Sequence, residues 1–293
     1  MRKYDPNGGE LWTRQFGTVA NDQALAVAVD STGVYVAGHT NAALPGQTLG
    51  SPGVDDAFVR KYDRNGNELW TRQFGTASTE QAHGVAADST GVYVVGNTNG
   101  PLGLPSTIGA FDAFIRKYDA NGNAPWTRQF GTAANDYAWA VAASSSGIYA
   151  AGRTDGAFPG QTNASPGVRD AFVRKFDSAG SDQWTRQFGT QGQDEALGVA
   201  ADATGVTVVG NVNFALPGAT GNTAAHAFAR RRSWARSTPL LWRFPPPPFL
   251  RVSLSSVRNH SASPAFSTAS RSARRSRSAY RAALSVGAPF RRS

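Results

Sequence analysis

The sequence WTRQFGT fills residues 12–18, and the same seven letters return in three further copies, at residues 70–76, 126–132 and 184–190. The spacings between copies are 58, 56 and 58 residues. A second motif, DAF(V/I)RK(Y/F)D, begins at Asp56, Asp112 and Asp170. Its last four letters also open the chain, at residues 2–5. Such regularity predicts similar structural units, each packed on its neighbour.

Each period is expected to contain four short strands. Residues 25–29 and 34–37 are apolar and β-branched, and they flank a turn in which Gly33 can take a positive φ. Residues 58–62 and 68–74 flank a second turn that contains Asn-Gly, a pair typical of tight hairpins. The small-residue strand suits the crowded inner position, and the WTRQF strand suits the outer edge. Four strands per period indicate the blades of an all-β propeller.

The combined pattern DAFVRKYDxxGxxxWTRQFGT, followed by AxxVAxDxxGVYVxGxT and a long Pro/Gly-rich connection, resembles the bacterial SBBP β-propeller repeat family over about residues 2–228. The resemblance implies a ring of blades, seven by the family's name, usually on exported or cell-surface proteins. This chain has fewer repeats than seven blades need, shows no signal peptide and begins inside a blade. We therefore expect upstream repeats to be missing from this reading frame.

The repeats predict three complete blades, at about residues 24–74, 82–130 and 138–188. A fourth, mixed blade would combine residues 2–16 with residues 196–228, because the first segment holds the outer strands that the second lacks. A mixed blade of this kind would remove exposed strand edges. Closure into a four-bladed ring and an open arc both remain compatible with the sequence.

The segment 229–293 differs from the repeats. It contains 14 Arg and no Lys, Asp or Glu, whereas the first 228 residues carry 15 Lys and Arg against 20 Asp and Glu. The segment is rich in Ser, Ala and Pro and has no amphipathic pattern, so we expect disorder. Its composition suits a coding region translated out of frame. The alternative is an Arg-rich arm that binds nucleic acid or another polyanion, although phosphates would be repelled by the acidic repeats.

Composition excludes several kinds of chemistry. The chain has no Cys, so disulfides and thiolate chemistry are impossible. No apolar run reaches the roughly 18 residues of a membrane helix, and no membrane insertion is expected. Nucleophile, phosphate-binding and zinc motifs are absent. The four histidines are scattered, and the Asp-x-Asn-Gly turns lack further calcium ligands. We therefore expect no catalytic residues, no metal and no cofactor.

Positions that differ between nearly identical copies mark the candidate ligand site. They lie at the entry to the inner strand, where blade loops surround the mouth of a propeller channel, and the predicted ligand-binding residues are Gln23, His83, Tyr137, Trp139 and Glu195. Tyr and Trp offer broad apolar area with a polar group, which suits sugar rings or peptides. Packing between blades is the alternative explanation for this variation. The Pro/Gly-rich connections form a second candidate surface, at residues 41–55, 98–111, 155–169 and 212–225.

The leading hypothesis is a non-catalytic binding or structural module of an exported or cell-surface protein, with a protein or glycan ligand. Because a fold does not define a function, the alternative is a hydrolase or lyase with its site at the channel mouth and some catalytic residues missing from this chain. A polyanion binder acting through the Arg-rich segment is the third hypothesis.

The out-of-frame interpretation makes a genomic prediction. Translation of the two other frames downstream of the Phe228 codon should yield a sequence like RKYDxxGxxxWTRQFGT. If neither frame does so, the Arg-rich segment is a genuine part of the protein, and its binding to polyanions should weaken with added salt.

Overall fold

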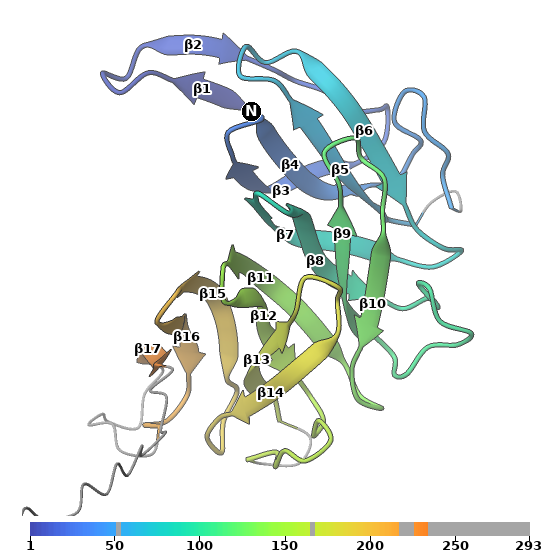
Figure 1. The fold of residues 1–293 in the computed structure, drawn as a ribbon. Helices are drawn as coiled ribbons and strands as arrows, with labels where there is room; N and C mark the ends of the chain where they lie inside the picture. Colours follow the sequence, from blue (N-terminus) through green and yellow to red (C-terminus); the bar gives the residue numbers. More distant parts are fainter. Residues whose placement is uncertain (51–53, 165–167, 217–225, 234–293) are drawn as a thin grey trace, which may run out of the picture. The chain divides into compact units, whose positions relative to one another are not determined.

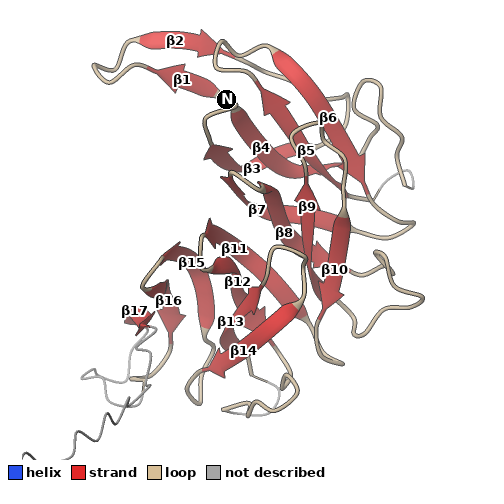
Figure 2. Cartoon of the chain, viewed as in Figure 1, coloured by secondary structure: helices blue, strands red, loops and turns tan. Residues whose placement is uncertain are grey.

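The structure is a computed structural model, and it describes residues 1–50, 54–164, 168–216 and 226–233. Every regular element within these ranges is a β-strand, and none of the described residues forms a helix that could cross a membrane (Figure 2). The strands form antiparallel sheets that follow one another along the chain. The prediction of an all-β fold built from four-stranded blades is confirmed.

Three sheets contain four strands each, and in each sheet the strands lie side by side in chain order (Figure 1). The first contains β3 (Asp22–Val29), β4 (Val34–Thr40), β5 (Asp56–Tyr62) and β6 (Glu68–Phe74). The second contains β7 (Glu80–Asp88), β8 (Gly91–Thr98), β9 (Asp112–Tyr118) and β10 (Trp126–Phe130). The third contains β11 (Asp136–Ser144), β12 (Gly147–Thr154), β13 (Asp170–Phe176) and β14 (Asp182–Phe188).

Two smaller sheets stand where the sequence predicted one mixed blade. One contains only β1 (Arg2–Tyr4) and β2 (Glu10–Thr13), and the other contains β15 (Glu195–Asp202), β16 (Gly205–Val212) and β17 (His226–Ser233). The mixed blade is therefore not formed as one sheet. The physical reason is that β17 already pairs with the edge of β16 that β1 would need, while the β1–β2 hairpin packs beside the first complete sheet.

The boundary predicted at Phe228 also needs correction. The strand β17 continues to Ser233, and the backbone of Arg230 lies opposite Val208 in the β16 register. A β-ladder is held by backbone N–H and C=O groups, so the loss of the repeat's side-chain pattern after Phe228 does not end the strand. The prediction of disorder covered residues 229–293; residues 229–233 belong to β17, and residues 234–293 lie outside the described residues.

The core consists of layers between consecutive sheets. The layer between the first two sheets joins Tyr35 and Ala37 of β4 to Val92 and Val94 of β8. Similar layers lie between the second and third sheets, and between the third sheet and β15–β17. The middle strands have neighbours on both faces, and β4 and β5 are buried along their whole lengths. This double burial explains why VYVAG lacks the alternation of a half-exposed strand.

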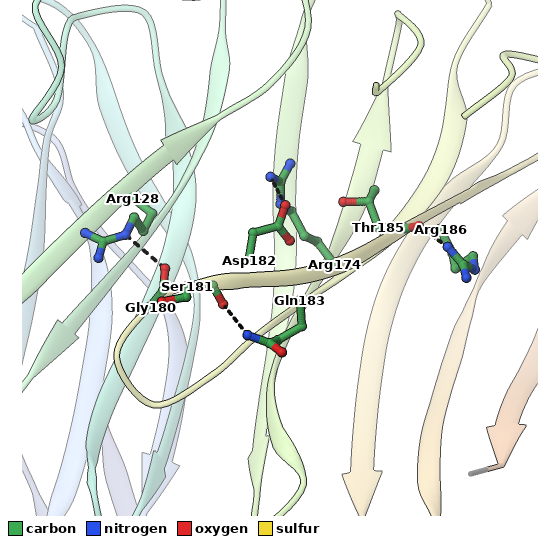
Figure 3. Close-up of polar contacts among 8 residues, drawn as sticks. All are labelled: Arg128, Arg174, Gly180, Ser181, Asp182, Gln183, Thr185 and Arg186. Carbon is green, nitrogen blue, oxygen red and sulfur yellow. Dashed lines mark hydrogen bonds and ion pairs between the residues drawn. The ribbon is translucent and has the colours of Figure 1, made fainter. Parts of the chain in front are cut away.

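In the first two complete sheets, the fourth strand is joined to the turn between the third and fourth strands of the following sheet. Trp70 Nε1 donates a hydrogen bond of 3.0 Å to Ala120 O, and Arg72 Nε donates one of 2.8 Å to Gly122 O. Arg128 Nε reaches Gly180 O in the same way, at 2.9 Å (Figure 3). We call this contact between a Trp-x-Arg strand and the following turn the inter-sheet clasp. It recurs at the N-terminal hairpin, where Arg14 Nε bonds Gly66 O at 2.6 Å.

The clasp requires glycine in the turn for two reasons. Gly122 has a φ of +78°, a conformation that side chains with a Cβ adopt at a cost. A Cβ on Gly122 would also lie 2.9 Å from the Trp70 ring. Gly160 has a similar φ of +70°, but no atom lies within 4 Å of the position its Cβ would take. Substitutions at the two glycines therefore distinguish the energetic cost of backbone strain from the cost of losing the clasp.

Replacing Gly122 by Ala is expected to destabilise the protein more than replacing Gly160 by Ala. Both variants bear the backbone cost of about 1–2 kcal/mol, and Gly122→Ala adds the displacement of the Trp70 ring, a steric penalty of about 1–3 kcal/mol. Urea unfolding followed by circular dichroism would measure the difference. Equal losses in the two variants would show that the clasp adds nothing to stability.

Candidate functional site

A β-bulge lies at the same place in the inner strands β3, β7, β11 and β15. The register between β11 and β12 skips Trp139, and the residues skipped at the equivalent positions are Leu25, His83 and Leu197. A glycine stands opposite each bulge, because a Cβ on Gly152 would lie only 1.8 Å from Tyr137 O. A bulge redirects a side chain out of the regular alternation. The backbone therefore redirects the side chain at one of the positions where the copies differ.

Aromatic rings form a continuous stack beside two of these bulges. The centroids of His83 and Trp139 lie 4.4 Å apart, and Trp139 stacks on Tyr137 at 5.3 Å with an interplanar angle of 7°. Tyr137 then stacks on Phe111 at 5.5 Å. The stack joins the start of β11 to β7 and to the residue before β9, so it crosses from the second sheet to the third.

Charged side chains continue the stack toward β15. The Arg153 guanidinium lies 4.5 Å from the centroid of the Tyr137 ring, which is cation–π geometry. Its Nη1 is 3.3 Å from Glu195 Oε1, and Arg169 Nη1 donates a 2.8 Å hydrogen bond to the same oxygen. The Arg153 side chain is 14% exposed. Among the described residues, Trp139 Nε1 and Arg153 Nε are buried without a hydrogen-bond partner.

The His83 imidazole is uncharged at neutral pH. Burial lowers the pKa of His83 to about 4, although the hydrogen bond to Asn97 acts in the opposite direction. Its Nε2 lies 2.6 Å from Asn97 Oδ1. His83 therefore contributes an aromatic face and one polar contact rather than a positive charge.

Four of the five residues predicted from the sequence lie in this one set of contacts: His83, Tyr137, Trp139 and Glu195. The fifth, Gln23, lies exposed on β3, opposite His39 in the register with β4. No described contact joins its side chain to the other four. That these residues bind a ligand stays a prediction.

The sequence interpretation missed Phe111, Arg153 and Arg169, which complete the set. The signal was present, because Arg153 occupies a position at which the other copies differ, as His39, Asn97 and Asn211. Comparing the copies at the end of the second strand, and not only at the first strand, would have identified it.

The variable positions also meet in pairs across the boundary between consecutive sheets. Gln81 Nε2 donates a 2.5 Å hydrogen bond to Asp55, whereas the next two boundaries have the Tyr137–Phe111 stack and the Glu195–Arg169 ion pair. Each boundary thus has a different chemical contact at the same place. These pairs support the packing explanation for the variation. They also mean that the polar, aromatic and charged side chains at this end differ from one sheet to the next.

Buried carboxylates form a second cluster at each boundary. The pairs are Asp56 with Glu80, Asp112 with Asp136, and Asp170 with Asp194, and all six side chains are 0% exposed. A Cβ on Gly75 would lie 2.2 Å from Asp56 Oδ1 and 2.8 Å from Glu80 Oε2, so the pair is close together. Paired carboxylates can serve acid–base catalysis, but full burial prevents a substrate from reaching these.

Hydrogen-bond donors of the protein itself hold these carboxylates in place. The backbone N–H of Thr76 donates to Glu80 at 2.6 Å, and Thr132 donates to Asp136 at the same distance. Burial raises the pKa of Asp136 to about 6, and the neighbouring charge of Asp112 acts in the same direction. The acids that open the first strands therefore accept hydrogen bonds from the local backbone.

In the turns that resemble calcium loops, backbone N–H groups of the same turn bind the Asp oxygen that a calcium ion would need. Asp63 Oδ1 accepts hydrogen bonds from the N–H groups of Asn65 and Asn67, both at 2.8 Å. Hydrogen bonds from Asn67 lower the pKa of Asp63. In the described part of the chain, no group of three or more His, Asp or Glu side chains is placed to hold a metal ion.

Comparison with known proteins identifies the repeat. Residues 69–103 match the family described as "SBBP: Beta-propeller repeat". The matched segment runs from one WTRQFGT motif through the following inner hairpin, and the other copies repeat it. The repeat of this chain is therefore an SBBP β-propeller repeat, in agreement with the resemblance found in the sequence.

Two individual proteins are also similar. The chain is 28% identical over 221 residues to a protein named "Regulatory protein FlaEY" from Caulobacter vibrioides, a match that covers 69% of this chain and 23% of the relative. This chain therefore matches about a quarter of that protein's length. A crystal structure of a protein of unknown function from Bacteroides caccae has a TM-score of 0.39 and 11% identity, covering 69% of this chain and 58% of that one.

The buried acids predict a pH dependence of stability. The pKa of Asp136 is about 6 in the folded protein, above the value near 4 of an unfolded chain. Folding then takes up a proton between these pH values, so this residue stabilises the fold below about pH 4 and loses that effect as the pH rises through 6. Its contribution is on the order of 3 kcal/mol.

Urea unfolding at several pH values would measure this effect. The free energy of unfolding of Asp136→Asn should depend less on pH between 4 and 6 than that of the unaltered protein. Asp63→Asn is the matched control, because the pKa of Asp63 lies below its usual value and the change should leave the slope in this window unaltered. Identical slopes for Asp136→Asn and the unaltered protein would contradict the assignment.

Proposed function

We propose that this protein is a non-catalytic binding module and that its ligand contacts the end of the sheets where the β-bulges lie. One observation carries this proposal: residues that differ between nearly identical copies converge at that end, around Tyr137 and Trp139. The matched pairs across the sheet boundaries account for part of this variation, and the proposal rests on the aromatic stack that these differences create at one end. The ligand class that suits stacked aromatic rings beside Arg153 is a glycan or an extended peptide.

The wider setting is part of the same proposal. SBBP repeats are usual in exported or cell-surface bacterial proteins, and we place this protein there. The Caulobacter relative is named a regulatory protein, and a regulatory role is compatible with binding a partner rather than transforming a substrate. The Arg-rich segment, as a polyanion binder, remains the third hypothesis, and it lies outside the described residues.

The enzyme alternative is less well supported by the described residues. The titratable pairs that could perform acid–base chemistry, such as Asp112 and Asp136, are fully buried. The half-buried set around Tyr137 combines the neutral His83 imidazole with an Arg–Glu–Arg network, in which Glu195 is already engaged by two guanidinium groups. Neither arrangement leaves an accessible base beside a nucleophile.

Residues that the repeat itself carries provide substitutions that should preserve folding. Tyr137→Gln reproduces Gln81, and Trp139→Leu reproduces Leu25 and Leu197 at equivalent positions. We expect the double variant to lose binding on a glycan and peptide array, because it removes the stacked aromatic surface. Circular dichroism would verify that the sheets persist.

Leu25→Ala is the matched control, since it alters the same bulge position in a sheet without aromatic residues there. It should leave array binding unchanged. Binding that survives Tyr137→Gln with Trp139→Leu would exclude this surface as the ligand site. An array that the unaltered protein does not recognise would favour a purely structural module.

A further inference from the structure

The two ends of the described chain hold complementary halves of one sheet. The hairpin β1–β2 corresponds in sequence to the third and fourth strands of a complete sheet, because residues 2–4 repeat the Arg-Lys-Tyr of β5 and β2 carries the first letters of WTRQFGT. The hairpin β15–β16 corresponds to the first and second strands. In the described chain, these halves belong to separate sheets.

An apolar groove lies on the face of the first sheet that corresponds to the face covered by an inner hairpin in the second sheet. Val27 and Val29 of β3 are 61% and 66% exposed, whereas Val85, the equivalent of Val27 in β7, is 9% exposed. The groove has a volume of about 560 Å³, and its lining includes Trp12, Phe16, Val27, Val29, Val34 and Val36. It thus lies between the N-terminal hairpin and the face of β3–β4.

The established layers show what covers this face elsewhere. Val85 and Val92 of the second sheet pack against Ala26 and Tyr35, which belong to the inner hairpin of the preceding sheet. The corresponding layer on the first sheet contains only Met1, Trp12 and Phe16 of the N-terminal segment. The uncovered part of the groove therefore matches an inner hairpin of this same repeat.

The third strand of the missing sheet can be assembled from two chain segments. In β17, residues 226–228 retain most of the repeat's letters and pair with Val212 to Gly210, while residues 230–232 pair with Val208 to Val206. The repeat's letters are lost after Phe228, and they resume at Arg2 with the sequence that belongs opposite Val208. Only residues 229–233 would have to leave β16 for β1 to take their place.

Tyr4 of β1 is exposed, whereas the residues at its position in the complete sheets are buried. The residues at its position in β5, β9 and β13 are Tyr62, Tyr118 and Phe176, which are 3%, 1% and 2% exposed. Tyr4 is 51% exposed. Placed beside Val206 of an inner hairpin, Tyr4 would be buried as its equivalents are.

We propose that two copies of this chain complete each other's sheets. The hairpin β15–β16 of one copy occupies the groove of the second copy and pairs with its β1, giving a shared sheet in the order β15–β16–β1–β2. Two copies joined at both ends hold eight four-stranded sheets, six internal and two shared, which is within the usual range of four to eight propeller blades. The edge of β1, which pairs only with β2 in the described chain, is then covered.

The mass of the full chain in solution tests this arrangement. Light scattering during size-exclusion chromatography should show a two-chain species that forms as concentration rises. Val27→Asp with Val29→Asp should abolish it, because charges would be buried in the groove. Leu104→Asp, at an exposed apolar residue outside the groove, should not. A single-chain mass at every concentration would overturn the proposal, and so would a two-chain species that survives the groove substitutions.

Introduced cysteines test the register, because the chain has no Cys of its own. In the shared sheet, Lys3 lies opposite Thr207, as Lys61 lies opposite Tyr35 in the first sheet. A mixture of Lys3→Cys and Thr207→Cys chains, treated with a short thiol cross-linker, should yield a two-chain product. Each variant alone is the background control.

The double variant Lys3→Cys with Thr207→Cys distinguishes the two ways of completing the sheet. A cross-link within one chain would show that a single copy closes on itself, and this would overturn the two-copy arrangement. No cross-link above background in the mixture would overturn it as well.

Discussion

The inter-sheet clasp is the interaction on which the rest of the structure depends. The N-terminal hairpin and the first two complete sheets are each held to the following sheet by an arginine and a tryptophan that donate to the backbone carbonyls of a neighbouring turn. Because a carbonyl acceptor exists whatever the side chain, the turn can contain Arg64, Ala120 or Ser178 and still receive the tryptophan's hydrogen bond. The turn residue that cannot be replaced freely is the glycine, because a Cβ there would meet the tryptophan ring.

The same logic explains why WTRQFGT does not vary. Beside the clasp residues, Gln73 receives the backbone N–H of Leu44 and donates to Asp56, so it connects a long loop to a buried acid. Gly75 leaves space between two carboxylates, and Thr76 donates to one of them. Nearly every letter has a partner in another strand or sheet, whereas the copies differ at the bulge end, in the long connections and in the turns. Sheets with the same backbone structure therefore present different side chains at the bulge end.

Much of the candidate site could be predicted because the copies serve as their own alignment. Differences at positions 137 and 139 stand out against identical surroundings, and the structure brings four of the five predicted residues into contact. Gln23 was included by the same reasoning and is not joined, because no described residue contacts it as Asp55, Phe111 and Arg169 contact the equivalent side chains of the later sheets. Arg153 was missed because its position lies on a different strand, and only pairing between β11 and β12 places it beside Tyr137.

The sequence by itself determined the strands, their order and their turns, because each is encoded by local chemistry: alternation, Asn-Gly and Asp-x-x-Gly turns, and a motif repeated four times. Tertiary structure alone decided which edges are paired. The N-terminal hairpin and β15–β16 match each other in sequence, yet the strand β17 holds the edge of β16 as far as Ser233. Backbone hydrogen bonds form a ladder with any side chain that tolerates the geometry, so the repeat pattern specifies a strand but does not specify its partner.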